Sequence, residues 1–316
     1  MPTSLRIWLA ACATLFWSLV STSVFAAGCE ELIASFNKDI DLGREESAQH
    51  AVDRIATDAT CGANQVLAQR RLAAFRLRAA HLLMARGRPA ADYERLLTAA
   101  DSVQVLWQAA ATLGDVRFGE RRFPEAAIAF DRDIEILKNP SLTPAPPSTF
   151  DVNGLFQRAA QARLLAANSI NSEGPKFVKN ARDDRDGTIG GMYSPSVRGI
   201  VPQNIPVPIT FEYGKTALTP VGEEAARELI AVLKEQHPGR VTLVGHTDSR
   251  GTAEYNLTLS RERAEAVAQF LHENGVNAEI ETIGKGAAEP LKIEDTSGLT
   301  QDDLYALNRR VEWRRH

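Results

Sequence analysis

The chain has 316 residues, enough for two ordinary domains, and its 44% apolar and 24% charged residues are values typical of globular proteins. The formal net charge is −4, so the chain lacks the surplus of basic residues that neutralises phosphates. This composition is not that of a disordered or membrane-spanning chain, and we expect no nucleic-acid partner.

The first 26 residues differ in character from the rest. Arg6 precedes a mostly apolar run of 14 residues, from Ile7 to Val20, and small residues follow up to Ala26. A short positive region, an apolar core and a small-residue end are typical of a secretory signal peptide. The core is shorter than the ~20 residues of a membrane span, which an uncleaved anchor, the alternative, would need. We therefore predict a signal peptide over residues 1–26 and an exported chain.

Export changes how the cysteines are interpreted. After cleavage Cys29 and Cys61 form an even pair in an oxidising compartment, which favours a disulfide. On the chain-entropy model, a disulfide that closes a loop of about 30 residues stabilises the folded state by about 3 kcal/mol. The alternative is a lipoprotein signal with an acylated Cys29, although Ala26 stands where such signals usually have Leu. We predict the disulfide; membrane association is compatible with the sequence but not required.

Residues 29–167 are predicted to form an α-helical array. Apolar residues recur there at helical spacing, without the alternation that is typical of half-buried strands. Helices are expected near residues 64–86, 90–101, 103–119 and 124–138, and a last helix near 153–167. The breaks at Gly87 and Gly119 lie 32 residues apart, close to the tetratricopeptide period of about 34 residues.

The segment from Trp107 to Pro140 is the clearest copy of such a repeat. It resembles a tetratricopeptide repeat in Leu113-Gly114, Phe123, Glu125-Ala126, Phe130 and Pro140, and departs from it at Arg117. The resemblance implies that the small residues let two antiparallel helices pack closely, with the phenylalanines between helix pairs. The alternative is the core of an ordinary helical bundle. Repeat arrays present a concave surface to proteins or peptides, so we expect an envelope-protein partner.

Residues 168–204 are predicted to be a linker, because they are rich in Gly, Asn, Ser and charge and lack a sustained apolar period. Strand and helix alternate over residues 205–316. Strands are expected at 205–211, 240–246, 278–284 and 310–315, and helices from Pro220, from Ala253 and at 299–307. This βαβαβ(α)β order predicts one mixed sheet covered by helices, so the fold class is α plus α/β.

Two elements of this second domain deliver an acid and a guanidinium to one place. Asp248 lies in the turn after a buried strand, and Arg263 lies on the following helix. Together they are complementary to a zwitterionic amino-acid head, with charge-assisted bonds of about 1.5–3 kcal/mol each. The further candidates are Thr247 in the turn, Asn256 and Leu259 on the helical face of Arg263, and Arg309 and Arg310 near the C-terminus.

These residues belong to a longer ordered set that resembles the OmpA-like peptidoglycan-binding domain, as in peptidoglycan-associated lipoproteins and the periplasmic part of flagellar stators. The set is Phe211-Glu212-Tyr213, Val244-Gly245-His246-Thr247-Asp248, Gly251, Tyr255-Asn256, Leu259-Ser260, Arg263-Ala264, Gly284-Lys285-Gly286, Pro290 and Asn308-Arg309-Arg310-Val311-Glu312. It covers about residues 205–316. Glu212 departs from the Asp that is more usual in the family.

The resemblance implies that Asp248 takes the ammonium and Arg263 the α-carboxylate of diaminopimelate in the peptidoglycan stem. It implies non-covalent binding without enzymatic activity, cofactor or metal. We expect a periplasmic, wall-associated protein, compatible with a place at the outer membrane, that tethers the helical array to the cell wall.

Two other functions are open. The chain could be an envelope assembly or adaptor protein that acts mainly through the helical array. It could also be a cell-wall hydrolase, because His246, Asp248 and Ser249 or Ser260 are the residue types of a catalytic triad. No nucleophile elbow supports a hydrolase, and no metal-binding spacing supports a site at His246, Asp248 and His272.

Overall fold

The computed structural model describes residues 28–62, 64–145, 148–169, 193–202, 204–212, 214–293, 296 and 298–315. The predicted signal peptide lies outside these residues, as does most of the predicted linker. The chain divides into two compact units, which meet in sequence between Val105 and Leu106. Among the described residues, no helix combines the length and the apolar character that a bilayer crossing requires.

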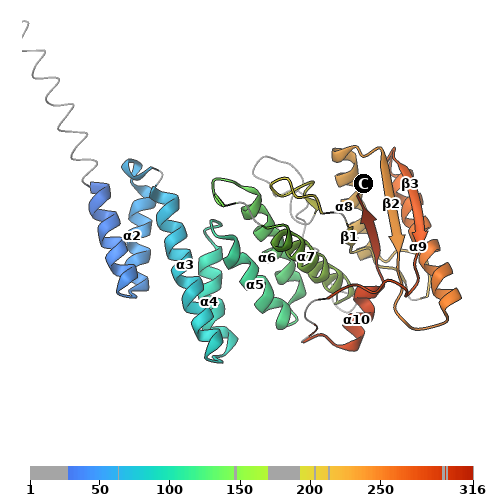
Figure 1. Ribbon diagram of the computed structural model, residues 1–316, viewed down its shortest axis with the longest axis horizontal. Coiled ribbons are helices and arrows are strands. Elements are labelled where there is room, and N and C mark those ends of the chain that lie inside the picture. The colour runs from blue at the N-terminus through green and yellow to red at the C-terminus, as the bar shows by residue number, and fades with distance from the viewer. Residues whose placement is uncertain are drawn as a thin grey trace, which may run out of the picture. The chain divides into compact units, whose positions relative to one another are not determined.

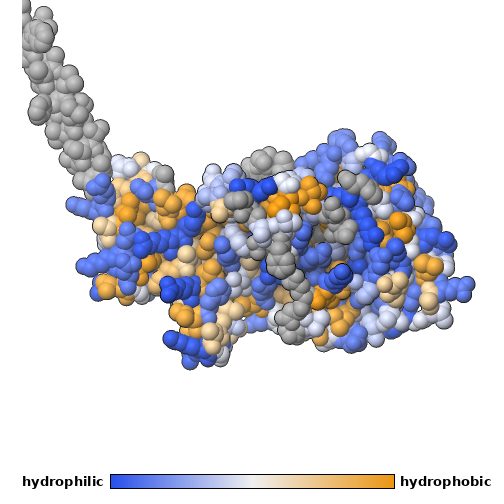
Figure 2. Space-filling view, in the orientation of Figure 1, coloured by the Kyte–Doolittle hydropathy of each residue, from blue (hydrophilic) through white to orange (hydrophobic). Residues whose placement is uncertain are grey.

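The first unit is entirely helical in its described part (Figure 1). Residues 28–41 form a helix, and α2 (Glu45–Thr57), the short 3-10 helix η1 (Ala59–Cys61), α3 (Asn64–Ala85) and α4 (Ala90–Asp101) follow it. Phe36, Ile55 and Leu72 lie in its core. Hydrophobic residues also reach its visible surface (Figure 2), and the side chains more than half exposed are Leu42, Leu67 and Leu82.

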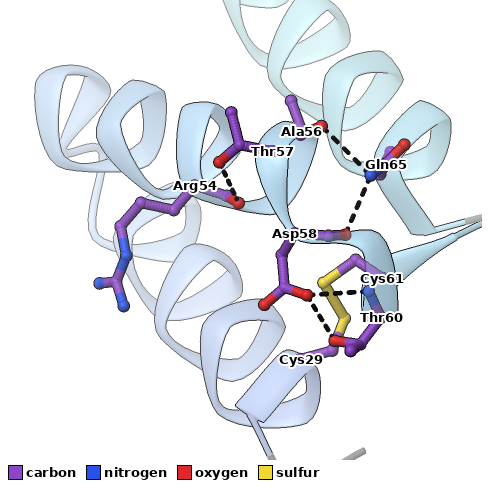
Figure 3. The surroundings of a disulfide bond; sticks show 8 residues. All are labelled: Cys29, Arg54, Ala56, Thr57, Asp58, Thr60, Cys61 and Gln65. Carbon is purple, nitrogen blue, oxygen red and sulfur yellow. Dashed lines mark hydrogen bonds between the residues drawn. A yellow bond between two sulfur atoms is a disulfide. The ribbon is translucent and has the colours of Figure 1, made fainter. Parts of the chain in front are cut away.

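A disulfide between Cys29 and Cys61 closes this unit, as predicted, with the two Cα atoms 5.4 Å apart. Asp58 begins η1 by accepting a hydrogen bond from the Thr60 backbone N–H at 2.8 Å (Figure 3). Gln65 Nε2 donates to the Asp58 carbonyl at 3.0 Å, which joins the start of α3 to the same turn. The disulfide therefore ties the first helix to a turn that is itself held by hydrogen bonds.

The second unit begins with α5 (Trp107–Gly119), α6 (Phe123–Lys138) and α7 (Thr149–Ser169). Gly114 lets α5 and α6 approach closely, because a Cβ added there would lie 2.5 Å from the Phe130 ring. The helices lie where the apolar spacing predicts them, and their classification as a tetratricopeptide repeat stays a prediction.

The remaining elements are β1 (Asn204–Val207), α8 (Pro220–Gln236), β2 (Arg240–Gly245), α9 (Ala253–Glu273), β3 (Glu279–Gly284), α10 (Gln301–Asn308) and β4 (Val311–Arg314). The sheet order is β1-β4-β2-β3, in which β2 and β3 are parallel and β4 is antiparallel to both neighbours. Threonine hydroxyls cap the three helices; Thr219, for example, accepts from the Gly222 N–H at 3.0 Å. The predicted fold class, helices followed by a mixed sheet with helices, is confirmed.

One apolar core joins α5–α7 to the sheet. Leu155 and Phe156 of α7 belong to the same buried cluster as Val311 and Trp313 of β4, and α7 contacts β1 (Figure 1). The sequence places a domain boundary near residue 168, whereas the compact units divide at 105/106. The difference arises because α7 buries an apolar face against the sheet domain, a tertiary contact that periodicity does not reveal.

Candidate functional site

Three glycines let α9 lie directly on the ends of β2 and β3. A Cβ on Gly245 would meet the Ser260 backbone carbonyl, and one on Gly284 would lie 2.7 Å from the Leu257 carbonyl. The Gly286 N–H donates to Ser260 Oγ at 2.8 Å. The turn that follows β2 and the N-terminal half of α9 are therefore held together by backbone contact.

Asp248 lies in this turn, only 6% exposed, and its carboxylate is held by two arginines. Arg250 Nη2 donates to Oδ2 at 2.7 Å and Arg309 Nη1 donates to the same oxygen at 2.9 Å. The Arg250 backbone N–H donates to Oδ1 at 3.0 Å. Burial alone would raise the pKa of Asp248, but these hydrogen bonds outweigh it and lower the pKa to about 2. The side chain is therefore an anion at neutral pH.

Arg263 lies on α9 and is 5% exposed. Its Nε donates to the Lys215 carbonyl at 3.1 Å, and its guanidinium lies over the Phe211 ring, 4.9 Å from the centroid. Burial, and then the positive charge of Arg309, lower the pKa of Arg263. Within the described part of the chain the two Nη groups make no hydrogen bond. They are the donors that a ligand carboxylate would use.

The other predicted residues near the turn have distinct environments. Asn256 Nδ2 donates to the Arg250 carbonyl at 2.9 Å, so Asn256 holds the turn in shape. Leu259 is buried on the same face of α9. Thr247 lines a cavity of about 290 Å³ together with Tyr305, and its buried Oγ1 has no hydrogen-bond partner among the described residues.

Arg309 and Arg310 are adjacent but serve different contacts. Arg309 reaches Asp248, whereas Arg310 donates to Glu312 Oε1 at 2.6 Å and to the Glu289 carbonyl at 3.2 Å. The Arg310–Glu312 ion pair is almost fully buried. The structure therefore brings Arg309 to the site and leaves Arg310 outside it.

Arg250 is a site residue that the sequence prediction missed. Besides its bonds to Asp248, its guanidinium lies 4.6 Å from the centroid of the Tyr305 ring. A signal was present, because an Asp in a turn commonly accepts a hydrogen bond from the backbone N–H two residues on. That geometry brings residue 250 next to residue 248.

The candidate triad residues are each engaged by different partners. His246 Nε2 lies 3.5 Å from Glu312 Oε2, and burial lowers the pKa of this histidine. Ser260 Oγ donates to the Leu257 carbonyl at 2.9 Å, and Asp248 binds arginines. Across the described ranges, no group of three or more His, Cys, Asp or Glu side chains is placed to hold a metal ion.

Comparison with known proteins gives matches to the C-terminal part of the chain. The model of the OmpA family matches residues 210–300. "Probable lipoprotein YiaD" of Escherichia coli (strain K12) is 37% identical over 110 residues, which are 34% of this chain and 48% of that protein. The "Peptidoglycan-associated lipoprotein" of Pseudomonas aeruginosa is 34% identical over 167 residues, 50% of this chain and 95% of that protein.

Among solved structures, the peptidoglycan-associated lipoprotein from Burkholderia pseudomallei is 26% identical and covers 35% of this chain and 88% of its own, with a TM-score of 0.29. The chain spans about half the length, 48%, of the YiaD relative. It spans nearly all, 95%, of the Pseudomonas aeruginosa relative.

Proposed function

The chain belongs to the OmpA family, and from this premise we propose that its C-terminal domain binds peptidoglycan non-covalently and holds the protein at the cell wall. The observation that carries the proposal is that the turn after β2 holds a buried, ionised Asp248, while the adjoining α9 carries a buried Arg263 whose Nη groups are unused by described residues. The name of the Pseudomonas aeruginosa relative, "Peptidoglycan-associated lipoprotein", supports the same ligand.

Within peptidoglycan, we assign the site to the zwitterionic end of diaminopimelate. Its ammonium would meet Asp248 and its α-carboxylate would meet Arg263, each through a charge-assisted hydrogen bond of about 1.5–3 kcal/mol. Arg250 and Arg309 keep the Asp248 carboxylate in place and ionised. Thr247 Oγ1, which bonds no described residue, would offer a further hydrogen bond to the stem peptide.

The proposed role is non-enzymatic and belongs to the periplasmic face of the envelope. A disulfide between Cys29 and Cys61 supports an oxidising compartment. A position at the outer membrane is compatible with this role. The helical part would then be held at the wall, where it could act as an adaptor by binding a second envelope protein. The core shared by α7 and the sheet favours this role, because it joins the helices α5–α7 firmly to the wall-binding domain.

Co-sedimentation of the purified protein with diaminopimelate-containing sacculi tests the proposal. Asp248→Asn keeps the side-chain shape and removes the charge, whereas Arg263→Lys keeps the charge and removes the guanidinium fork that binds a carboxylate through two N–H groups; each should weaken binding by about tenfold or more. Arg261→Lys, exposed on the same helix, is the matched control and should bind like the unaltered protein.

The ligand assignment needs a second measurement. A soluble stem peptide that ends in diaminopimelate should compete with sacculi, and the same peptide with lysine in its place should not. Circular dichroism checks that each variant is folded. Undiminished sedimentation of both folded variants would refute the site, and release of soluble muropeptides would favour the hydrolase instead.

A further inference from the structure

A cleft of about 1210 Å³ lies inside the second unit, apart from Asp248 and Arg263. Its lining comes from α5, α6 and α7 among the helices, and from β4, the preceding Arg310 and the segment 288–292. Pro206 of β1 also lines it. In Figure 1, α7 lies between α6 and β1, in agreement with its contacts to both. The cleft is therefore a feature of the helices and the sheet together.

Three side-chain amides follow one another along the cleft face of α7. Asn153, Gln157 and Gln161 are spaced by four residues and all line the cleft. No hydrogen bond joins these amides to other described residues: Asn153 is exposed, Gln161 is 7% exposed, and Gln157 Oε1 is a buried acceptor without a described partner. A buried acceptor without a partner, such as Gln157 Oε1, is unfavourable in a folded protein, so its place between two further amides on one helical face indicates a ligand that supplies the hydrogen bond.

The spacing of these amides matches an extended peptide. Four residues of α-helix advance about 6 Å, and two residues of extended chain advance about 6.6 Å. Each amide carries both a donor and an acceptor, so three of them can pair with alternate peptide groups of one strand. Strand β1 offers no equivalent edge here, because Pro206 lacks a backbone N–H.

The charges of the cleft favour an acidic segment. Its carboxylates are already paired: Asp115 with Arg158, and Glu289 and Glu312 with Arg314. Arg310 is 3% exposed, yet its Nη1 has no hydrogen-bond partner among the described residues. The exposed Lys292 stands nearby on the same cleft. Arg310 is itself paired with Glu312, so among the described residues Lys292 is the cation of the lining without a carboxylate partner, and Arg310 Nη1 adds a donor.

We propose that this cleft binds an extended segment of a partner protein that carries an acidic side chain. The amides of α7 pair with the peptide backbone, and Arg310 Nη1 and Lys292 receive the carboxylate. This site is separate from the proposed wall-binding site and does not depend on it. A protein held at the wall would in this way display a peptide-binding cleft.

The test uses the full chain without residues 1–26 and a phage library of random dodecapeptides. Selection should enrich acidic sequences, which are then synthesised with a fluorescent label for anisotropy measurements. Gly154→Trp should abolish binding, because Gly154 lines the cleft and a Cβ there meets no atom within 4 Å, so the indole fills the cleft without a clash at its base.

Gln157→Leu separates binding from folding. It should weaken the peptide by about tenfold and leave thermal stability equal or higher, since Gln157 has no described hydrogen bond to lose. Gln269→Leu, an exposed amide of α9, is the matched control and should bind normally. Lys292→Glu should weaken acidic peptides and leave the others unchanged.

Several results would overturn the proposal: no enrichment, enrichment without acidic bias, or equal binding to Gly154→Trp. Concentration-dependent self-association that Gly154→Trp abolishes would assign the cleft to a second copy of the chain instead. Sedimentation with sacculi should be the same for all cleft variants, so failure here is distinguishable from failure of the wall-binding proposal.

Discussion

Asp248→Asn should change the stability of the second unit in a manner that depends on pH. The pKa of Asp248 is about 2 in the folded protein, against an ordinary value of 3.8. A depressed pKa means that the ionised carboxylate stabilises the fold above pH 3.8 and that this contribution is lost as the pH falls to 2. The difference between the two pKa values corresponds to about 2 kcal/mol. At pH 7 the variant should be less stable by about that amount, since asparagine cannot reproduce the ionic hydrogen bonds.

Urea unfolding between pH 2 and pH 7, followed by tryptophan fluorescence, measures this difference. Without residues 1–26 the chain contains only Trp107 and Trp313, and both lie in the second unit, so the signal reports on that unit. The stability gap between the unaltered protein and Asp248→Asn should close as the pH approaches 2. Glu262→Gln, exposed on α9, is the control and should alter stability little at any pH.

A stability gap of the same size at pH 2 and pH 7 would refute the reasoning. It would mean that the shape of residue 248, rather than its charge, holds the turn. No gap at pH 7 would mean that the bonds from Arg250 and Arg309 contribute nothing net. In that case the carboxylate would lack the fixed, ionised state on which the proposed ammonium contact depends.

Two further predictions concern other parts of the chain. Cys61→Ser should lower the stability of the first unit by about 3–4 kcal/mol on the chain-entropy model, because the disulfide spans 32 residues, and thermal unfolding by far-ultraviolet circular dichroism measures the loss; an unchanged midpoint would contradict it. Burial raises the pKa of Glu228 to about 7 from an ordinary 4.5, against the opposing effect of Arg163. The neutral carboxyl is therefore favoured in the folded protein, and the stability that it provides is complete below pH 4.5 and is lost as the pH rises to 7. Glu228→Gln should therefore gain stability relative to the unaltered protein over that interval, by on the order of 3 kcal/mol above pH 7, and a gap in urea unfolding that does not vary with pH would argue against it.

The local parts of this structure could be predicted from the sequence. The helix that begins at Pro220 follows from a capping threonine and a proline at the first position, and both signals act within one turn. Asn256 and Arg263 share a face of α9 because helical spacing alone decides it. These features depend on residues that are close in sequence.

The parts that depend on distant residues could not be predicted in the same way. From the sequence alone, Arg309 and Arg310 are equally good candidates for the site. Only the position of β4 next to β2 decides that Arg309 reaches Asp248. The burial of Leu155 against the sheet likewise depends on where α7 comes to lie. Periodicity identifies an apolar face but not the surface that covers it, which is why the predicted boundary near residue 168 differs from the division of the compact units.

The contact of α9 with the strand ends through Gly245, Gly284 and Gly286 has a consequence for how the protein tolerates mutation. A helix that rests on side chains shifts whenever a core residue changes in volume, and binding groups on it shift too. Here the first turns of α9 rest on backbone atoms, which substitutions elsewhere in the core do not resize. A change in the volume of a core side chain therefore has little effect on the distance between Asp248 and Arg263. The core can vary in sequence while the spacing of the two charges is preserved.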